Sequence, residues 1–238
     1  MPSTVVHVAF ALLIAAALLG PAYDRRALVV VGGAVAFIDL DAFVSLVVEN
    51  THRAAFHTLL LPALVGGVVY VDTRLGEDSW LRERYGDRGV RVVWTTLVAV
   101  VVAGVGLDLF GAGGVNVFYP VVDQFYAFTG SIGWSSKHGV VQTFVQVHHP
   151  VTGGPAGGVD GGAIDVGQKG STREYRLSTG IDPSEGREPA GVERVFPLFY
   201  TGWQATLTLT GIVVTALKLR WADSPLAAES KEPRGAAE

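Results

Sequence analysis

The chain has 238 residues, of which 49% are apolar and 17% are charged, and its mean hydropathy is +0.37. This balance is typical of a membrane protein rather than a soluble domain of the same size. The net charge of −4 comes with basic residues in short clusters instead of one stripe, which argues against nucleic-acid binding. Because the chain contains no Cys, any bound metal must be held by His nitrogen and carboxylate oxygen.

Five apolar segments predict transmembrane helices. Four of them run with little interruption for close to the roughly 20 residues that a helix needs to cross the hydrocarbon core. The other, residues 27–48, is long enough but contains two aspartates. The first segment is followed, not preceded, by basic residues, which is the reverse of a signal peptide, so we expect it to be retained. The four uninterrupted segments are residues 4–22, 55–72, 91–110 and 200–219.

The basic residues of the short connections predict the orientation. Arg25 and Arg26 lie between the first two helices, five arginines lie within residues 74–91, and Lys218 and Arg220 close the last helix. These regions fall on one side of a five-helix arrangement, and the positive-inside rule makes that side cytoplasmic. We therefore expect a multi-pass protein of the cell membrane with its N-terminus outside and its C-terminus in the cytoplasm.

The predicted fold class is an all-α membrane protein with about five transmembrane helices. Between the fourth and fifth helices we expect a long extracytoplasmic region with some β-structure, because Gly and Pro clusters alternate there with short strand-like runs. The polar C-terminal tail is expected to be disordered. The predicted divisions are a four-helix core at 1–119, the Gly-rich extracytoplasmic segment at 120–198, a last transmembrane helix at 199–220 and the tail at 221–238.

Polar residues of four predicted helices fall at one depth. At about 1.5 Å per residue, His7, Asp39, His57 and Asp108 lie about 20 to 25 Å above the cytoplasmic helix ends. One ionisable residue near the bilayer centre costs roughly 2.5 to 3.5 kcal/mol, so several at one level predict a shared polar cavity. Carboxylates and imidazoles suit Zn, Mn or Fe. The sequence therefore predicts a divalent metal site, with Zn as the first choice.

The stretch FIDLDAFVSLVVENTHRAAFHTLLLP carries most of these polar positions. Asp39 and Asp41 would point about 200° apart on a regular helix, so both can face one cavity only if the helix breaks between them. The spacing of His52 and His57 predicts that His52 precedes the third helix and His57 lies on its first turns. Arg53 is cationic at any relevant pH and suits a carboxylate or a substrate phosphate.

At these residues the sequence resembles the membrane-bound, metal-dependent hydrolases of YdjM type. The family pattern is a His in the first helix, a D-x-D after the second, an H-R-x-x-x-H at the third, and an Asp followed twelve residues later by Pro. The matching positions, in order and with the same spacing, are His7, "DLD" at 39–41, "HRAAFH" at 52–57 and "DLFGAGGVNVFYP" at 108–120. The excess of Arg over Lys suggests a halophilic, archaeal member.

The resemblance implies a metal-dependent hydrolase that cleaves a phosphoester or a lipid-like ester. It also suggests a distant tie to the phospholipase C and P1 nuclease fold. The expected metal ligands are His7, Asp39, Asp41, His52, His57 and Asp108, and the expected catalytic residues are Asp39, Arg53 and Asp108.

Three positions depart from the family pattern. Gly104 stands where members often have a His one helical turn before the late Asp. Ala42 follows the D-x-D where a His is frequent, and Ala54 replaces the Gly of the usual H-R-G. We therefore expect a site with fewer ligands than in the best-matched members.

Two other functions stay open beside a metallohydrolase in which the metal activates water. An ion or proton transporter would also place Asp and His within the membrane, although the chain lacks the internal repeats of such proteins. A non-catalytic member that binds metal is the other alternative. The expected partners are the lipid bilayer and a lipid or phosphoester substrate. His138, His148 and His149 lie in the predicted external segment, where we expect them to be solvated.

Overall fold

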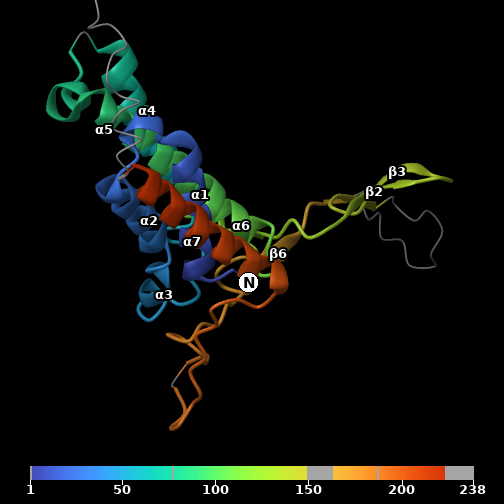
Figure 1. Cartoon of the computed structure of the whole chain (residues 1–238). Coiled ribbons are helices and arrows are strands. Elements are labelled where there is room, and N and C mark those ends of the chain that lie inside the picture. Colours follow the sequence, from blue (N-terminus) through green and yellow to red (C-terminus); the bar gives the residue numbers. More distant parts are fainter. Residues whose placement is uncertain (1, 77, 149–162, 187, 223–238) are drawn as a thin grey trace, which may run out of the picture. The chain divides into compact units, whose positions relative to one another are not determined.

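The computed structural model describes residues 2–76, 78–148, 163–186 and 188–222 (Figure 1). These residues form two compact units. The helical unit consists of Pro2–Leu40, Leu61–Gly104 and the chain from Pro197. The loop unit consists of Asp41–Leu60 and Val105–Phe196. The protein is mostly helical with small sheets, in agreement with the coarse fold class predicted.

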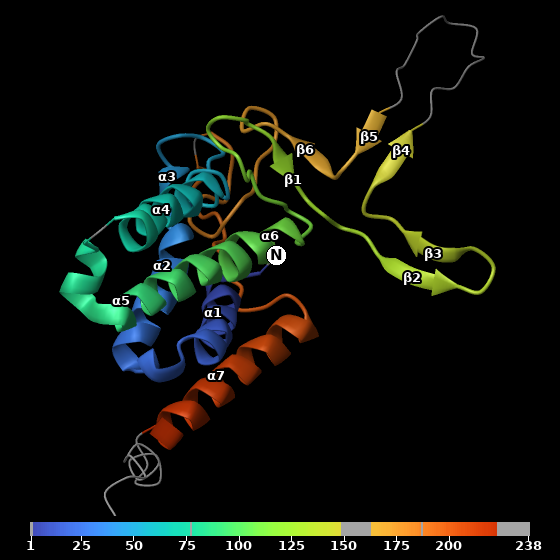
Figure 2. The ribbon, with the colours of Figure 1, turned by 90° about the horizontal axis from the view of Figure 1, so that it is seen from above.

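Packing in the helical unit centres on the first helix. α1 contacts α2, α5 and α7, and α2 also contacts α5 (Figures 1 and 2). The core between them consists of Ala, Val and Leu side chains. A Cβ added to Gly211 of α7 would lie 2.6 Å from the carbonyl oxygen of Ala9, so only glycine permits this approach of the two backbones. The helix bounds are α1 Thr4–Leu18, α2 Arg25–Ile38, α4 Leu60–Tyr70, α5 Trp80–Ala99 and α7 Gly202–Ala222.

Each of the five predicted transmembrane segments contains a helix. Among the described residues, two helices are long and apolar enough to cross a membrane, Arg25–Val44 and Trp80–Leu109. α1 is apolar but shorter. Five crossings are therefore not confirmed, and the number of crossings stays a prediction. The tail predicted at 221–238 lies almost entirely outside the described residues.

The third segment begins its helix later than predicted. α4 starts at Leu60, so His57 lies in the preceding loop and not on the first helical turns. The cause is a set of hydrogen bonds to another segment: Leu59 donates its amide to Val117 O at 2.8 Å, and Thr58 Oγ1 donates to the same oxygen at 3.1 Å. Proline is tolerated in a first helical turn, so Pro62 requires no kink.

The second long helix run changes its geometry before it ends. α5 passes into a π-helical stretch, Val100–Gly106, and then into the short α6, Leu107–Leu109. π-helical turns are rare in proteins, and those that occur often lie near functional sites. This one ends two residues before Asp108.

The loop unit contains the predicted β-structure as three antiparallel pairs, β1 with β6, β2 with β3, and β4 with β5 (Figure 2). It also contains the short helix α3, Asp41–Val44. One of its apolar clusters joins Ala54, Phe125 and Leu177, and another joins Val105, Val115 and Val117. The strands are β1 Phe125–Tyr126, β2 Ile132–Ser135, β3 Gly139–Gln142, β4 Gln146–His148, β5 Ala163–Asp165 and β6 Gln168–Gly170.

Candidate metal centre

The carboxylates of the D-x-D motif lie where the second helix breaks. α2 ends at Ile38, Asp39 caps it, and α3 begins at Asp41. Leu40 donates its amide to Phe37 O at 3.0 Å, which makes a turn between the two helices. The predicted break between the two aspartates is confirmed.

The loop after α3 holds two residues in left-handed backbone conformations. Asn50 and Arg53 each have a φ of 60°. Asparagine tolerates this region, whereas for arginine it costs about 1–2 kcal/mol. Two hydrogen bonds hold Arg53 there: its amide donates to Asp41 Oδ2 at 2.9 Å, and its carbonyl accepts from the Asn116 amide at 2.9 Å. A buried carboxylate and a neighbouring strand-like segment therefore fix the loop.

Asp41 accepts hydrogen bonds from three groups of this loop, and its side chain is fully buried. Asp41 Oδ1 lies 2.9 Å from His52 Nδ1, and Oδ2 lies 2.7 Å from His57 Nδ1 as well as 2.9 Å from the Arg53 amide. Because an ionised carboxylate can only accept, each imidazole carries a proton on Nδ1. Metal binding by either imidazole would then use Nε2, the usual arrangement in which a carboxylate orients a ligating histidine.

Asp108 is the second buried carboxylate of the site and lies in α6. Its Oδ1 lies 2.6 Å from Arg53 Nη2, and its Oδ2 lies 3.3 Å from His57 Nε2. A carboxylate at a helix C-terminus is disfavoured by the helix dipole, and the guanidinium offsets this. His57 thus lies between the carboxylates of Asp41 and Asp108, one at each ring nitrogen.

The charges of this group do not cancel when its imidazoles are neutral. We call Asp41, His52, Arg53, His57 and Asp108 the charge cluster. It holds two carboxylates against one guanidinium, and burial makes an uncompensated charge costly. Within these five residues the carboxylates outnumber the guanidinium by one, which suits a bound cation.

The donor atoms of one pair fit a divalent metal ion. Two ligands of a tetrahedral ion with bonds of about 2.0–2.1 Å lie about 3.4 Å apart, and His57 Nε2 and Asp108 Oδ2 are separated by 3.3 Å. The ring centroids of His52 and His57 are 6.2 Å apart, with the planes nearly perpendicular. Within the described ranges, no group of three His, Asp or Glu side chains is placed to hold one ion. The loop unit thus supplies a fitting pair of ligands without a complete set.

The remaining predicted ligands belong to the helical unit. His7 is buried on α1, and Asp39 is half-buried at the end of α2. That they converge with the charge cluster stays a prediction. His138 is exposed, as expected, whereas His149 lies outside the described residues.

A second polar network joins the loop that contains Asn50 to later parts of the chain, and it was not predicted from the sequence. Asp123 Oδ1 accepts from Asn116 Nδ2 at 2.7 Å and from the Thr172 amide at 3.0 Å, and Oδ2 accepts from Thr172 Oγ1 at 2.7 Å. Asn50 Nδ2 donates to Thr172 O at 2.8 Å. The only available signal in the sequence is Asn116, a lone amide in the apolar run GGVNVFYP.

Tyr175 brings the same late segment close to Arg53. Burial raises the pKa of the Tyr175 phenol, while the positive charge of Arg53 acts in the opposite direction. The neutral phenol donates to Gly113 O at 3.0 Å, and its ring contacts Phe125 edge to face at 5.3 Å. Residues 172–177 are therefore part of the structure that holds the charge cluster.

Two departures from the family pattern have a packing reason. A Cβ added to Gly104 would lie 2.2 Å from Ile38 Cδ1, so a larger residue requires Ile38 to move. Ala54 is fully buried and packs with Phe125 and Leu177. Its methyl group fills space in a core to which the late segment contributes, which a glycine would leave empty.

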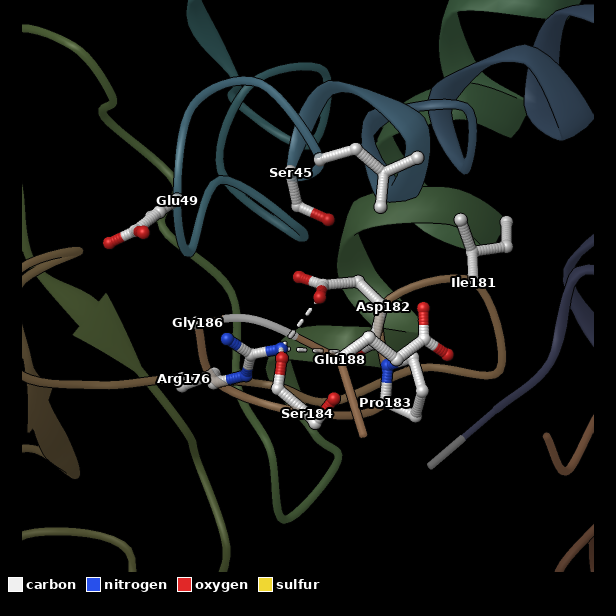
Figure 3. A pocket seen from close by; sticks show the side chains of 10 residues that line it. Ser45, Glu49, Arg176, Ile181, Asp182, Pro183, Ser184, Gly186 and Glu188 are labelled. Carbon is white, nitrogen blue, oxygen red and sulfur yellow. Dashed lines mark hydrogen bonds and ion pairs between the residues drawn. The ribbon is translucent and has the colours of Figure 1, made fainter. Parts of the chain in front are cut away.

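A pocket of about 140 Å³ lies elsewhere in the loop unit (Figure 3). Arg176 holds one wall of the pocket together. Its Nη2 donates to Asp182 Oδ1 at 2.7 Å and also to the Ser184 carbonyl. Glu188 pairs with Arg194 through both carboxylate oxygens. The pocket is lined by Ser45, Leu46, Glu49, Arg176, Ile181, Asp182, Pro183, Ser184, Gly186 and Glu188, and none of these belongs to the charge cluster.

The structure is that of a mostly helical protein with a buried cluster of carboxylates and imidazoles. The family model described as YdjM inner membrane protein matches residues 1–159, about two thirds of the chain. The chain therefore belongs to the YdjM inner membrane protein family, and the predicted resemblance and membrane location are confirmed. No curated protein and no solved structure matches the chain. The matched region ends before Thr172, Tyr175 and Leu177.

Proposed function

We propose that this protein is a membrane-bound, metal-dependent hydrolase acting on a phosphoester or a lipid-like ester. The observation that carries the proposal is the pair of imidazoles bound through Nδ1 to Asp41, with His57 Nε2 beside Asp108 Oδ2 at 3.3 Å. Buried imidazoles fixed in this way are prepared to bind a cation through Nε2. Membership of an inner membrane family supports a substrate that is reached from the bilayer.

In this proposal the charge cluster holds the ion. Asp41, predicted from the sequence as a ligand, instead orients the imidazoles, because both of its carboxylate oxygens already accept hydrogen bonds. His57 and Asp108 are the pair of ligands whose donor atoms fit, and His52, His7 and Asp39 are the further ligands predicted from the sequence. Zinc is the first choice for this donor set, with manganese or iron as alternatives. When bound, such an ion lowers the pKa of water toward about 7 and polarises an ester oxygen.

The other roles follow from charge and geometry. Arg53 holds Asp108 through Nη2, and its guanidinium suits the negative charge of a phosphoester. Asp39, at the end of α2, keeps the role of general base predicted from the sequence, since a carboxylate can accept a proton from the attacking water. Asp41 would keep both imidazoles in the tautomer with the proton on Nδ1 and none on Nε2.

Elemental analysis of the purified protein tests the metal. We expect a stoichiometric divalent ion in the wild type and its loss in His57→Ala and Asp108→Ala. His138→Ala is the matched control, since that imidazole is exposed and remote in sequence from the cluster. Metal retained in both cluster variants would refute this ligand assignment. Turnover of phosphoester and acyl-ester lipids by the metal-loaded wild type tests the chemistry.

The packing of Gly104 favours a second candidate, a member that binds metal without catalysis. The neighbouring Ile38 occupies the space that a histidine would need. In this case the metal analysis would give the same result but no lipid ester would be hydrolysed. Hydrolysis gained in the double variant Gly104→His with Ile38→Ala, and absent in the wild type, would establish the second candidate.

We further propose five membrane crossings with the N-terminus outside and the C-terminus in the cytoplasm. The support is the distribution of Arg and Lys in the short connections together with the five longer helices. Because the chain has no Cys, single cysteines can be introduced and labelled from one side of sealed vesicles. Cysteines at Arg25 and Arg88 should react only from the cytoplasmic side, and labelling of either from outside would contradict the orientation.

A further inference from the structure

The β2–β3 hairpin presents an apolar face to solvent. In its antiparallel register Trp134 pairs with Val140 and Ile132 pairs with Gln142, so these side chains lie on one face. Trp134 is 81% exposed, Ile132 71% and Val140 64%. Large exposed apolar side chains gathered on one face mark an interaction surface. Figure 2 shows the two strands running side by side to the hairpin turn.

The base of the hairpin is bound to the end of an apolar helix. The Phe128 amide donates to Leu109 O at 2.7 Å, and the rings of Phe110 and Phe128 meet at 6.3 Å. Leu109 is the last residue of the candidate membrane span Trp80–Leu109. Six residues separate Phe128 from Trp134, a reach of at most about 20 Å. The hairpin therefore starts where this helix would leave the hydrocarbon core.

The connection between base and hairpin is ordered by hydrogen bonds. Ser131 donates its amide to Thr143 Oγ1 at 2.8 Å, and the Thr143 amide donates to Ser131 O at 2.9 Å. These bonds extend the ladder of β2 and β3 toward Phe128. The apolar face is thus carried on a paired element, not on a single extended strand.

The charge of the region fits an anionic surface. Residues 124–159 contain no Asp or Glu, although the chain has 22 acidic residues. Lys137 and His138 lie exposed at the hairpin turn. Anionic headgroups attract the ammonium group of Lys137. Tryptophan is favoured at the boundary between headgroups and acyl chains. A protein partner with an acidic surface would satisfy the charge, but the closeness to a helix end favours lipid.

We propose that the β2–β3 hairpin is an interfacial anchor that docks its Ile132, Trp134 and Val140 face on a bilayer containing anionic phospholipid. Lys137 lies over the headgroups, and the apolar side chains enter the boundary region. When the hairpin docks, it holds the part of the chain around β2 and β3, which follows Asp108, at the membrane surface. This inference rests on the family's membrane location and is independent of hydrolysis.

The absence of Cys allows a direct test with environment-sensitive fluorophores. Ile132→Cys labels the proposed docking face, and Val141→Cys labels the opposite face of the same hairpin, since Val141 pairs with Gly133. Each labelled full-length protein is placed in nanodiscs of phosphatidylcholine with one quarter phosphatidylglycerol. Spin-labelled lipid should quench the Ile132→Cys probe at least twofold more than the Val141→Cys probe, with a blue-shifted emission.

Three controls make the outcome decisive. Lys137→Glu should reduce the quenching at Ile132→Cys in anionic discs and leave it nearly unchanged in discs of phosphatidylcholine alone. The difference between wild-type and Trp134→Phe emission spectra should show a blue-shifted Trp134. Equal, water-like emission at both labelled faces would overturn the proposal. Shielding of the Ile132→Cys probe in lipid-free amphipol that grows with protein concentration would instead identify a second copy as the occupant, and would also overturn it.

Discussion

The helical unit and the loop unit differ in the charged groups that they bury. In the helical unit, Ala, Val and Leu form the core, and α1 and α7 approach closely at Ala9 and Gly211. In the loop unit, two buried carboxylates, a buried guanidinium and two imidazoles hold a loop that has no helix or strand. The loop unit also has two small apolar clusters, but its buried charges depend on pairing with one another, whereas the core of the helical unit depends on shape.

This difference shows what a binding site requires in a mostly apolar chain. A regular helix satisfies its own backbone groups, so close helix packing needs no buried side-chain partners. Where α2 breaks at Asp39, the backbone groups of the following loop need partners, and Asp41 provides one to the Arg53 amide. The same carboxylate then positions His52 and His57. Polar side chains and irregular backbone therefore occur together.

The largest effect is expected from Asp41→Ala. It removes the acceptor of three donors and leaves the charge of Arg53 with one carboxylate fewer nearby, which should destabilise the protein by about 3–5 kcal/mol. Thermal unfolding in detergent, followed by tryptophan emission, measures the shift. Asp182→Ala is the control, because its carboxylate belongs to the partly exposed pair with Arg176. Equal shifts in both variants would remove the distinction between the charge cluster and ordinary ion pairs.

The pair of Arg53 and Asp108 should show strong coupling in a double-mutant cycle. Arg53→Met and Asp108→Asn each leave a buried charged partner behind, whereas the double variant removes both charges. We expect an interaction free energy of about 1–3 kcal/mol, with the double variant more stable than the sum of the single losses predicts. Additive losses would mean that the 2.6 Å contact contributes no coupling.

Gly211→Val tests the shape-dependent interior. The added side chain would meet the Ala9 backbone, so the two helices must separate, at a cost of about 1–3 kcal/mol. Gly33→Ala is the matched control in α2, since nothing lies within 4 Å of an added Cβ there, and it should be neutral or slightly stabilising. If Gly211→Val unfolds at the wild-type temperature, α1 and α7 do not pack as described.

The smallest effect concerns an exposed pair of the helical unit. The hydrogen bond from the Ala27 amide lowers the pKa of Asp24, and Arg88 lowers it further. A lowered carboxyl pKa contributes stability above the unfolded value of about 3.9 and loses it as the pH falls through the folded value. Asp24→Asn keeps a capping side chain and should cost about 0.2–0.5 kcal/mol at pH 7. The difference from wild type should begin to shrink below about pH 4 and should vanish once the pH lies below the folded pKa of Asp24. A difference that grows on acidification would contradict it.

Asp39 and Asp41 are two residues apart and cannot share a face of a regular helix, so the spacing indicated that a common cavity would require a break between them. The structure has that break. Helix rise also placed His57 and Asp108 at one level, and both belong to the charge cluster. Asp41 was a candidate only through the D-x-D motif, and that His7 and Asp39 join the cluster stays a prediction. The helix start at 55 was wrong, since periodicity does not reveal that Leu59 would bond to Val117 across the chain. The hydrogen bonds between Asp123 and Thr172 could not be predicted for the same reason. They join distant positions in a Gly-rich segment that has no repeating pattern.

The central claim is that Asp41 holds two imidazoles through Nδ1 and so directs their Nε2 atoms to the site. Nitrogen NMR of protein labelled with ¹⁵N-histidine in nanodiscs tests it directly, with His52→Gln and His57→Gln to assign the signals. We predict a proton on Nδ1 of both residues and the loss of this common state in Asp41→Asn. A neutral imidazole at either residue with its proton on Nε2 instead of Nδ1 in the wild type would contradict the account.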